Sequence, residues 1–435
     1  MRRRSGFTIV ELLVAMALIL FIMAILSEAF VAGLTCFREL KSTADLAERL
    51  RSTTTILRRE LAADHFDGKR RMSQPDFWLS QESTVTSSPP EGFFRIYQGS
   101  ASVLEGYDTT ELNPVVPNVR YMNSYHATNH MLHFTAKLRG NERGDFYSAG
   151  DIPASGAALI TSQYLFGTRH YEESATVYNS QWAEVVYFLR ATGDTAKGGT
   201  PLFALYRRQF LLVLDNALLS APIKGVPSSY PEMSCRDDGT GTGTLYFNNP
   251  RDVTMPIRRS GMIPNPNTFV PAPVPAYPAN AGLAGIPLYV DTTTTPSTAK
   301  VGYQTMADVN AAMAGSDILL SNVLSFEVRI LPIGGTQFVD LFDSSLTVNK
   351  PGNSVFNGAG QARVFDTWSN MNEKTVAGAP TPAYDYSQSV AANATAQPYA
   401  MPFPTTVRPK AIQVIIRVWD EKTFQTRQVT VVQDL

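Results

Sequence analysis

A long apolar segment close to the N-terminus constrains this chain more than any other feature of its sequence. Residues 7–26 contain a single charged side chain, Glu11, and the next charge along the sequence is Glu28. About 20 helical residues, each rising roughly 1.5 Å, cross a hydrocarbon core of about 30 Å. The segment therefore predicts a transmembrane helix, which we place at residues 7–30.

The charges around this segment predict how it is oriented in the membrane. Arg2, Arg3 and Arg4 precede it, and no Lys or Arg follows until Arg38. Basic residues flanking a membrane helix stay preferentially in the cytoplasm. We therefore expect residues 1–6 to be cytoplasmic and the bulk of the chain to lie outside the cytoplasm.

Two simpler interpretations compete with a specialised membrane helix. The first is a secretory signal peptide, since the small residues Ser27 and Ala29 would allow cleavage after Ala29. The apolar core of such a peptide is usually about 7–15 residues long and uncharged, which does not fit this segment. The second is a plain anchor, but a carboxylate within a span costs on the order of 2–3 kcal/mol, so Glu11 would need a reason to be there.

The residues around the start of the apolar segment resemble a known signal. The run Gly6-Phe7-Thr-Ile-Val-Glu11 resembles the class III signal of type IV pilins and of type II secretion pseudopilins. The resemblance implies that residues 1–6 are a leader, and that a prepilin peptidase cuts between Gly6 and Phe7 and methylates the new amine of Phe7. It also implies an inner-membrane protein with a periplasmic head, whose partners are other pilin or pseudopilin subunits.

The spacing of Phe7 and Glu11 fits this role physically. Residues four apart share one face of a helix. In a filament of staggered helices, the Glu11 carboxylate of one subunit would neutralise the Phe7 amine of a neighbour. Two costly buried charges would then become one pair that sets the register between subunits.

A second helical segment is expected directly after the membrane helix. No proline occurs before Pro75, and Gly33 is the only glycine between residues 7 and 67. We place an amphipathic helix at residues 31–66, ending near His65, in a rod of about 90 Å that is half in lipid and half packed under a head. The alternative is two helices with a break near Gly33. The predicted apolar stripe consists of Phe37, Leu40, Ala44, Ala47, Leu50, Thr54, Leu57 and Leu61.

The remainder of the chain, residues 67–435, has the pattern of a β-rich head. Short apolar runs are separated by turn residues, and two adjacent pairs of runs predict antiparallel hairpins, 184–190 with 202–210 and 411–419 with 427–432. The fold class is therefore expected to be α+β and pilin-like, with one long helix packed on an antiparallel sheet. The predicted strands are 93–97, 131–138, 158–166, 183–190, 202–214, 317–331, 411–419 and 427–432.

An amphipathic helix ending in Leu57-Arg58-Arg59-Glu60-Leu61, followed by four stretches of the head in a fixed order, is similar to J-type minor pseudopilins. The four stretches of the head carry the rest of the resemblance. They are Arg207-Arg208, the run from Ile318 to Arg329, Thr367-Trp368 and the run from Arg408 to Arg417. This resemblance implies a non-catalytic minor pseudopilin that assembles into or caps a periplasmic pseudopilus for type II secretion-like export. The alternative is a minor type IV pilin acting in assembly, adhesion or DNA uptake.

The chain is longer than a usual pseudopilin, and two biased stretches account for much of the excess. Residues 262–300 are rich in proline, and a second stretch covers residues 372–409. Both are expected to be surface insertions, with contact to a partner or cargo as the functional alternative.

Charge and motif content argue against nucleic-acid binding and catalysis. Lys+Arg 37 and Asp+Glu 38 nearly balance, so no broad basic field attracts nucleic acid. The basic clusters Lys69-Arg70-Arg71, Arg207-Arg208 and Arg258-Arg259 are short and are expected to be solvated surface. No Gly-x-Ser-x-Gly elbow or comparable catalytic constellation occurs, so an enzyme is not expected.

Candidate metal ligands are few. His126, His130 and His133 have a helical spacing, but residues 131–138 predict a strand, where positions 130 and 133 point to opposite faces, and no cysteine or acidic residue adjoins them in the sequence. Asp237 and Asp238, before a glycine-rich turn, leave calcium open, although an EF-hand needs more alternating oxygen ligands.

The cysteine content excludes a disulfide framework. Only Cys36 and Cys235 are present, so one bridge at most is conceivable in an oxidising compartment.

Overall fold

The computed structural model of the chain describes its helix and most of one large sheet. The described residues are 8–74, 91–98, 105, 126–140, 142–149, 178–196, 199–214, 223–224, 232–237, 244–254, 259, 288–291, 298–301, 318–341, 364–367 and 408–435. The predicted strand 158–166 lies outside them, as do most of the two insertions. Within the first insertion, β10 (Leu288–Asp291) pairs with β11 (Thr298–Val301), and Pro409, the last residue of the second, opens strand β14.

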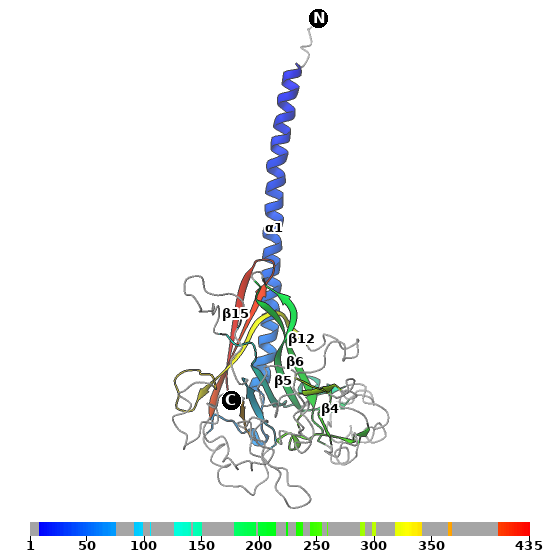
Figure 1. Cartoon of the computed structure of the whole chain (residues 1–435), viewed down its shortest axis with the longest axis vertical. Helices are drawn as coiled ribbons and strands as arrows, with labels where there is room; N and C mark the ends of the chain where they lie inside the picture. The colour runs from blue at the N-terminus through cyan, green and yellow to red at the C-terminus, as the bar shows by residue number, and fades with distance from the viewer. Residues whose placement is uncertain are drawn as a thin grey trace, which may run out of the picture.

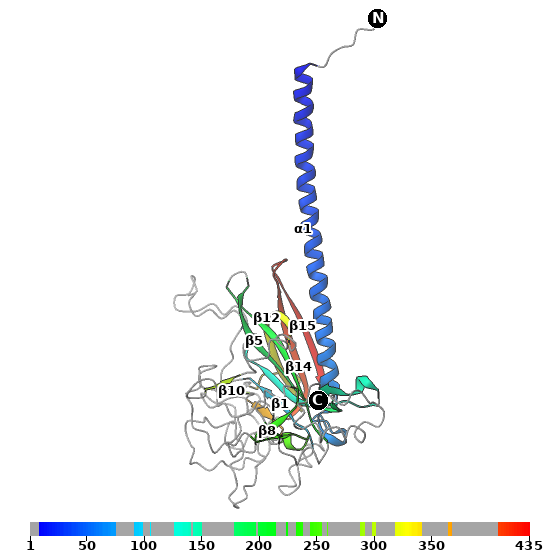
Figure 2. The same ribbon diagram turned by 90° about the vertical axis from the view of Figure 1, so that its right-hand side faces the viewer.

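One continuous helix, α1 (Ile9–Ala62), forms the long axis of the molecule. Its 54 residues correspond to about 80 Å, and Figures 1 and 2 show it extending well beyond the β-rich head. The alternative with a break near Gly33 is wrong, because the helix runs through this position. The helix ends three residues before the predicted His65, where Ala63 becomes extended and its N–H bonds the carbonyl of Arg59.

The helix contacts the head over a shorter length than predicted. Its buried residues begin at Leu50, and the first described side-chain hydrogen bond to the head joins Ser42 to Asp420, with the two side-chain oxygens 2.8 Å apart. The prediction that this half of the helix packs against the head is therefore wrong for the first four residues of the predicted apolar stripe. Phe37 and Leu40 are 67% and 63% exposed, and Ala44 and Ala47 are also exposed.

The head is built on an eight-stranded antiparallel sheet in the order β13-β1-β2-β5-β6-β12-β14-β15. This confirms the α+β fold class and both predicted hairpins. The strand bounds, in sheet order, are β13 (Val364–Asp366), β1 (Phe94–Tyr97), β2 (Met131–Lys137), β5 (Trp182–Thr195), β6 (Pro201–Leu211), β12 (Ile318–Pro332), β14 (Pro409–Asp420) and β15 (Gln425–Asp434).

Smaller elements extend the head at its periphery. Among the described residues, two small sheets lie outside the main one in addition to the β10–β11 pair, and three short 3-10 helices occur. Their bounds are β3 (Tyr147–Ala149) with β4 (Tyr178–Ser180), β7 (Ile223–Lys224) with β9 (Thr244–Phe247) and β8 (Cys235–Asp237), and 3-10 helices at Asp67–Lys69, Arg143–Asp145 and Asp252–Thr254.

The core lies between the lower part of α1 and one face of the sheet. Successive side chains of a strand point to opposite faces, so alternate residues of β12 enter the core. Phe326, Val328 and Ile330 are fully buried, and each faces a β14 residue in register, as Phe326 does Ile416. Leu57 and Leu61 of α1 belong to the same buried cluster. Because Leu57 and Leu61 are packed in this cluster, the direction in which α1 leaves the head is fixed.

Candidate functional site

The start of α1 carries the residue to which the sequence assigns a role in assembly. Thr8 caps the helix: its hydroxyl oxygen accepts the N–H of Glu11 at 3.3 Å, and the Glu11 carboxylate accepts the Thr8 N–H at 2.9 Å. This reciprocal capping box was not predicted, although Thr8 followed three residues later by Glu11 is its usual signature. Gly6 and Phe7 lie outside the described residues, so the cleavage site and the Phe7–Glu11 pair stay predictions.

Above the head, α1 presents an apolar surface with nothing packed against it. It is the one helix in the described part of the chain that is long and apolar enough to span a membrane, and none of its apolar window is buried. Such a surface requires lipid or other helices around it. The exposed large apolar residues are Ile9, Val10, Leu12, Leu13, Val14, Met16, Leu18, Ile19, Leu20, Phe21, Ile22, Met23, Ile25, Leu26, Phe30, Val31, Leu34, Phe37 and Leu40.

The lower end of α1 is fixed to the sheet by a buried ion pair. Glu60 is fully buried and accepts hydrogen bonds from Arg207, whose Nε lies 2.9 Å from Oε1, and from the hydroxyl of Tyr187. Burial and the nearby Glu60 carboxylate raise the pKa of Tyr187 well above its usual value, so Tyr187 stays a hydrogen-bond donor. Glu60 therefore links the helix to β5 and β6.

Two of the three basic clusters are not the solvated surface that the sequence predicts. Arg207 donates to Glu60, and Arg259 is 1% exposed, with its guanidinium 3.7 Å from the centroid of the Phe93 ring. The expectation is wrong for these two residues because each has a buried carboxylate or an aromatic ring as a partner. Arg258 lies outside the described residues.

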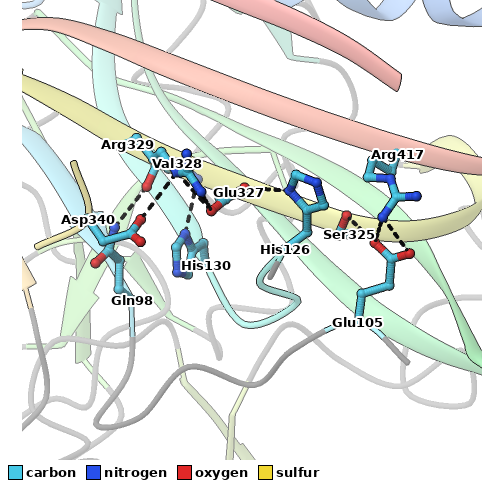
Figure 3. A network of polar contacts seen from close by, with 10 residues as sticks. All are labelled: Gln98, Glu105, His126, His130, Ser325, Glu327, Val328, Arg329, Asp340 and Arg417. Carbon is cyan, nitrogen blue, oxygen red and sulfur yellow. Dashed lines mark hydrogen bonds and ion pairs between the residues drawn. The ribbon is translucent and has the colours of Figure 1, made fainter. Parts of the chain in front are cut away.

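On the other face of the sheet, a polar network joins β12 to segments that precede β2 (Figure 3). Arg329 and His126 both contact Glu327, with His126 Nδ1 2.8 Å from the carboxylate. Glu105 pairs with Arg417 at 2.7 Å and accepts the Ser325 hydroxyl at 2.9 Å. The network ties together segments that are far apart in the sequence.

The segments that precede β2 also cover the edge of β12 where this strand does not pair with β6. That pairing involves β12 residues 318–323 only. Further along, the N–H of Phe326 donates to Ala127 O at 3.2 Å, and that of Val328 donates to His130 Nδ1 at 3.0 Å. Gln98 adds a bond from Nε2 to Val328 O at 2.8 Å. The chain thus covers this open strand edge with its own residues.

The three histidines have separate partners. His126 contacts Glu327, and His130 accepts the Val328 N–H, which places the remaining ring proton on Nε2. His133 contacts Glu184 at 2.7 Å, and Glu184 also accepts the Ser234 hydroxyl. Two of these histidines therefore contact acidic residues that are distant in the sequence. However, no group of three His, Cys, Asp or Glu side chains that would hold a metal occurs among the described residues.

The remaining candidate ligands are not brought together. Asp237 ends β8, and Asp238 lies outside the described residues, so calcium there stays a prediction. Cys36 is exposed on the projecting helix, whereas Cys235 is buried in the head, and both are free. The bridge that the sequence left open is absent from this structure.

Burial favours the neutral form of two histidines in the head, His65 and His130. His65 lies between the carbonyl oxygens of Thr135, 2.8 Å from Nδ1, and Leu61, 3.2 Å from Nε2. Burial lowers its pKa from 6.5 to about 4, and the two carbonyls offset this only partly. Burial likewise lowers the pKa of His130 to about 3.

We therefore expect the stability of the head to fall as the pH falls from 7 to 4. The pKa of His65 in the folded protein lies below that of the unfolded chain, so between the two values the unfolded chain binds more protons. The stabilisation that comes from neutral His65 is complete above pH 6.5 and is lost as the pH falls towards 4. For His65 alone, the free energy of unfolding falls by about 3 kcal/mol over this range. Urea unfolding of the full chain in detergent, followed against pH, measures this. His65→Gln should flatten the profile, and identical profiles for both proteins would contradict the assignment.

Comparison with known proteins identifies the N-terminal segment. Residues 1–27 match the family model described as a prokaryotic N-terminal methylation motif. Comparison with curated proteins and with solved structures gives no match. The motif, followed by a membrane-length helix and an antiparallel sheet, supports a pilin-type protein. It also implies processing by a prepilin peptidase and assembly with other pilin-type subunits.

Proposed function

We propose that this chain is a non-catalytic minor pseudopilin that assembles into or caps a periplasmic pseudopilus of a type II secretion-like system. The observation that carries the proposal is the methylation motif at residues 1–27, placed at the start of a helix that leaves the head with its apolar surface bare. In this proposal the helix anchors the unassembled subunit in the inner membrane, with residues 1–6 in the cytoplasm and the head in the periplasm.

The geometry of α1 suits a transfer from lipid to filament. Its apolar residues from Ile9 to Leu26 are exposed around the whole helix rather than along one stripe. A helix that is apolar all round is buried in lipid or among other helices. The same surface serves both states, and the Glu11 carboxylate at its start would pair with the Phe7 amine of a neighbouring subunit after cleavage.

The J-type assignment within this proposal is supported by where the similar stretches lie in the head. Arg207 and Arg208 are in β6, Ile318 to Arg329 in β12, and the run that begins at Arg408 continues as β14. These are three successive strands of the main sheet. Three of the four stretches of the head are therefore neighbours in the sheet, whereas Thr367 follows β13 at the opposite edge.

The alternative is a minor type IV pilin, which would share the whole N-terminal arrangement. The two roles differ in the partners that the head meets. Deleting the gene separates them: loss of an exported protein supports the pseudopilin, whereas loss of surface pili, adhesion or DNA uptake supports the pilin.

The N-terminus of the mature protein is the direct test of the proposed class. Protein isolated from its native membranes is expected to begin at methylated Phe7, because the peptidase cuts after Gly6 and leaves the apolar helix attached. Intact mass and N-terminal sequencing measure this. A chain that begins at Met1 has not been processed, and one that begins at Phe30 has been cut as a secretory signal; either result overturns the proposal. Cleavage after Ala29 would also sever α1 within its continuous span.

A further inference from the structure

The last strand of the chain, β15, forms a long edge of the main sheet. It pairs with β14 over residues 425–434 without a register shift. At the other end of the sheet, the edge strand β13 has only 3 residues. The outer side of β15 is therefore the long open edge of the main sheet as far as the structure describes it.

The direction of each backbone group on β15 follows from one hydrogen bond. The Leu435 N–H donates to the carbonyl of Lys410, directly opposite, at 3.0 Å. In an antiparallel ladder, hydrogen-bonded pairs recur at every second residue. Gln425, Arg427, Val429, Val431 and Gln433 therefore bond to β14. The groups that point outward belong to Thr426, Gln428, Thr430, Val432 and Asp434.

Apart from Asp434, whose carbonyl accepts the Gln433 side-chain amide at 3.4 Å, these outward groups are not used by the part of the chain that the structure describes. No described residue accepts from the N–H of Thr426, Gln428, Thr430 or Val432. The side chains of Thr426, Gln428, Val432 and Asp434 are exposed, and Val432 is 50% exposed although apolar. In contrast, side chains of the alternate residues, above all Val431, are turned inward. The edge is thus open, while one face of the strand is packed.

Apart from the charges of Arg427 and Asp434, the strand also lacks the features that usually protect an edge. Natural edges carry lysine, proline, a bulge or a covering segment, because an open row of backbone groups is a template for another strand. The sequence of β15 contains no proline, glycine or lysine, and its ladder contains no bulge. The same protein covers the exposed edge of β12 with Ala127 and His130, so an open edge is not a general property of this head.

We propose that the outer edge of β15 binds an extended segment of a different subunit of the same membrane-anchored assembly, which adds a ninth strand to the sheet. This rests on the proposed function, since the occupant is another filament subunit. Outward groups recur about every 6.8 Å along the strand, a spacing that an extended backbone matches.

The orientation of α1 favours a different subunit over a second copy of this chain. Two β15 strands paired antiparallel would be related by a two-fold axis perpendicular to the strands. Figure 2 shows α1 beside β15 and rising in one direction away from the head, so this axis would point the two anchors in opposite directions. Two copies inserted in one membrane could not pair in this way. If β15 of one copy paired instead with β13 of a second copy, a strand of ten residues would face a strand of three.

Photo-cross-linking of the full chain in its native membranes tests the proposal. A benzoylphenylalanine residue replaces Gln428 on the edge or, as a control, Asp194, which is exposed near the end of β5, four strands away from β15 in the main sheet. Mass spectrometry then identifies the joined peptides. We expect the probe at position 428 to join an extended segment of another chain that carries a prepilin-type N-terminus. We expect no such adduct from position 194.

Proline substitution then tests whether the backbone makes the contact. Thr430→Pro removes an outward N–H and leaves the bonds to β14 in place, so the adduct from position 428 should fall about tenfold, equivalent to the loss of roughly one hydrogen bond. The matched control Thr430→Ala should stay within about twofold, because it keeps the N–H. If Thr430→Pro does not fold, as judged by its urea unfolding, Thr426→Pro tests the other neighbour of position 428.

The remaining outcomes overturn the proposal. An adduct between two copies of this chain, an adduct that the folded proline variants do not reduce, or no adduct at all would each do so. Co-purification with filaments is measured in parallel. A chain that enters filaments but gives no adduct disproves only the edge contact, whereas a chain that never enters filaments disproves the proposed function with it.

Discussion

Cells that carry Glu11→Gln are expected to contain mature, cleaved protein that is almost absent from filaments. The substitution keeps hydrogen-bonding groups beside the Thr8 cap but removes the charge. In the proposed assembly, the Phe7 amine of a neighbouring subunit would then lie unpaired in an apolar layer. An unpaired charge there costs on the order of 2–3 kcal/mol, which lowers incorporation by roughly 30- to 150-fold. The ratio of the protein in sheared filaments to that in the membrane measures the effect.

Two control variants separate the charge from other roles of this segment. Thr8→Val removes the capping hydroxyl and keeps the carboxylate, so it should leave incorporation close to that of the unmodified chain. Glu28→Gln removes a charge at the far end of the apolar segment and should behave likewise. Glu11→Ala should match Glu11→Gln, with cleavage intact in both. Normal incorporation of either Glu11 variant would contradict the pairing with Phe7.

Local patterns in the sequence predicted the helix and the sheet because both depend on periodicity. Alternation in β14 and β15, and the absence of proline up to Pro75, are properties of neighbouring residues. Glu11 stood out for the same reason, as a single charge in an apolar run. These features need no knowledge of what lies across the fold.

The predictions that failed depended on distant contacts. The spacing of Phe37 and Leu40 indicates which face of the helix they occupy, but not how far the head reaches along it. The Arg207-Arg208 pair looks solvated in the sequence, because Glu60 lies 147 residues away along the chain. The position of Glu60 between Leu57 and Leu61, on the buried face of α1, was the one signal in the sequence that could have indicated the role of Glu60.

Removing the Glu60 carboxylate from α1 is expected to cause a large loss of stability. Glu60→Gln leaves Arg207 with a charge that is only 19% exposed and no carboxylate opposite it. It also leaves one acceptor oxygen in place of the two that serve Arg207 and the buried Tyr187 hydroxyl. Breaking a buried pair from one side costs about 3–5 kcal/mol, because the remaining charge is left without compensation. Urea unfolding of the full chain in detergent measures the loss.

The control for this change lies on the same helix. Glu48 is exposed, so Glu48→Gln should alter the free energy of unfolding by less than about 0.5 kcal/mol. The double variant Glu60→Gln/Arg207→Met removes both charges and should recover part of the loss, because no buried charge is then left without compensation. If Glu60→Gln were no more destabilising than Glu48→Gln, the pair would not anchor the helix. Packing by Leu57 and Leu61 alone would then hold α1 against the sheet.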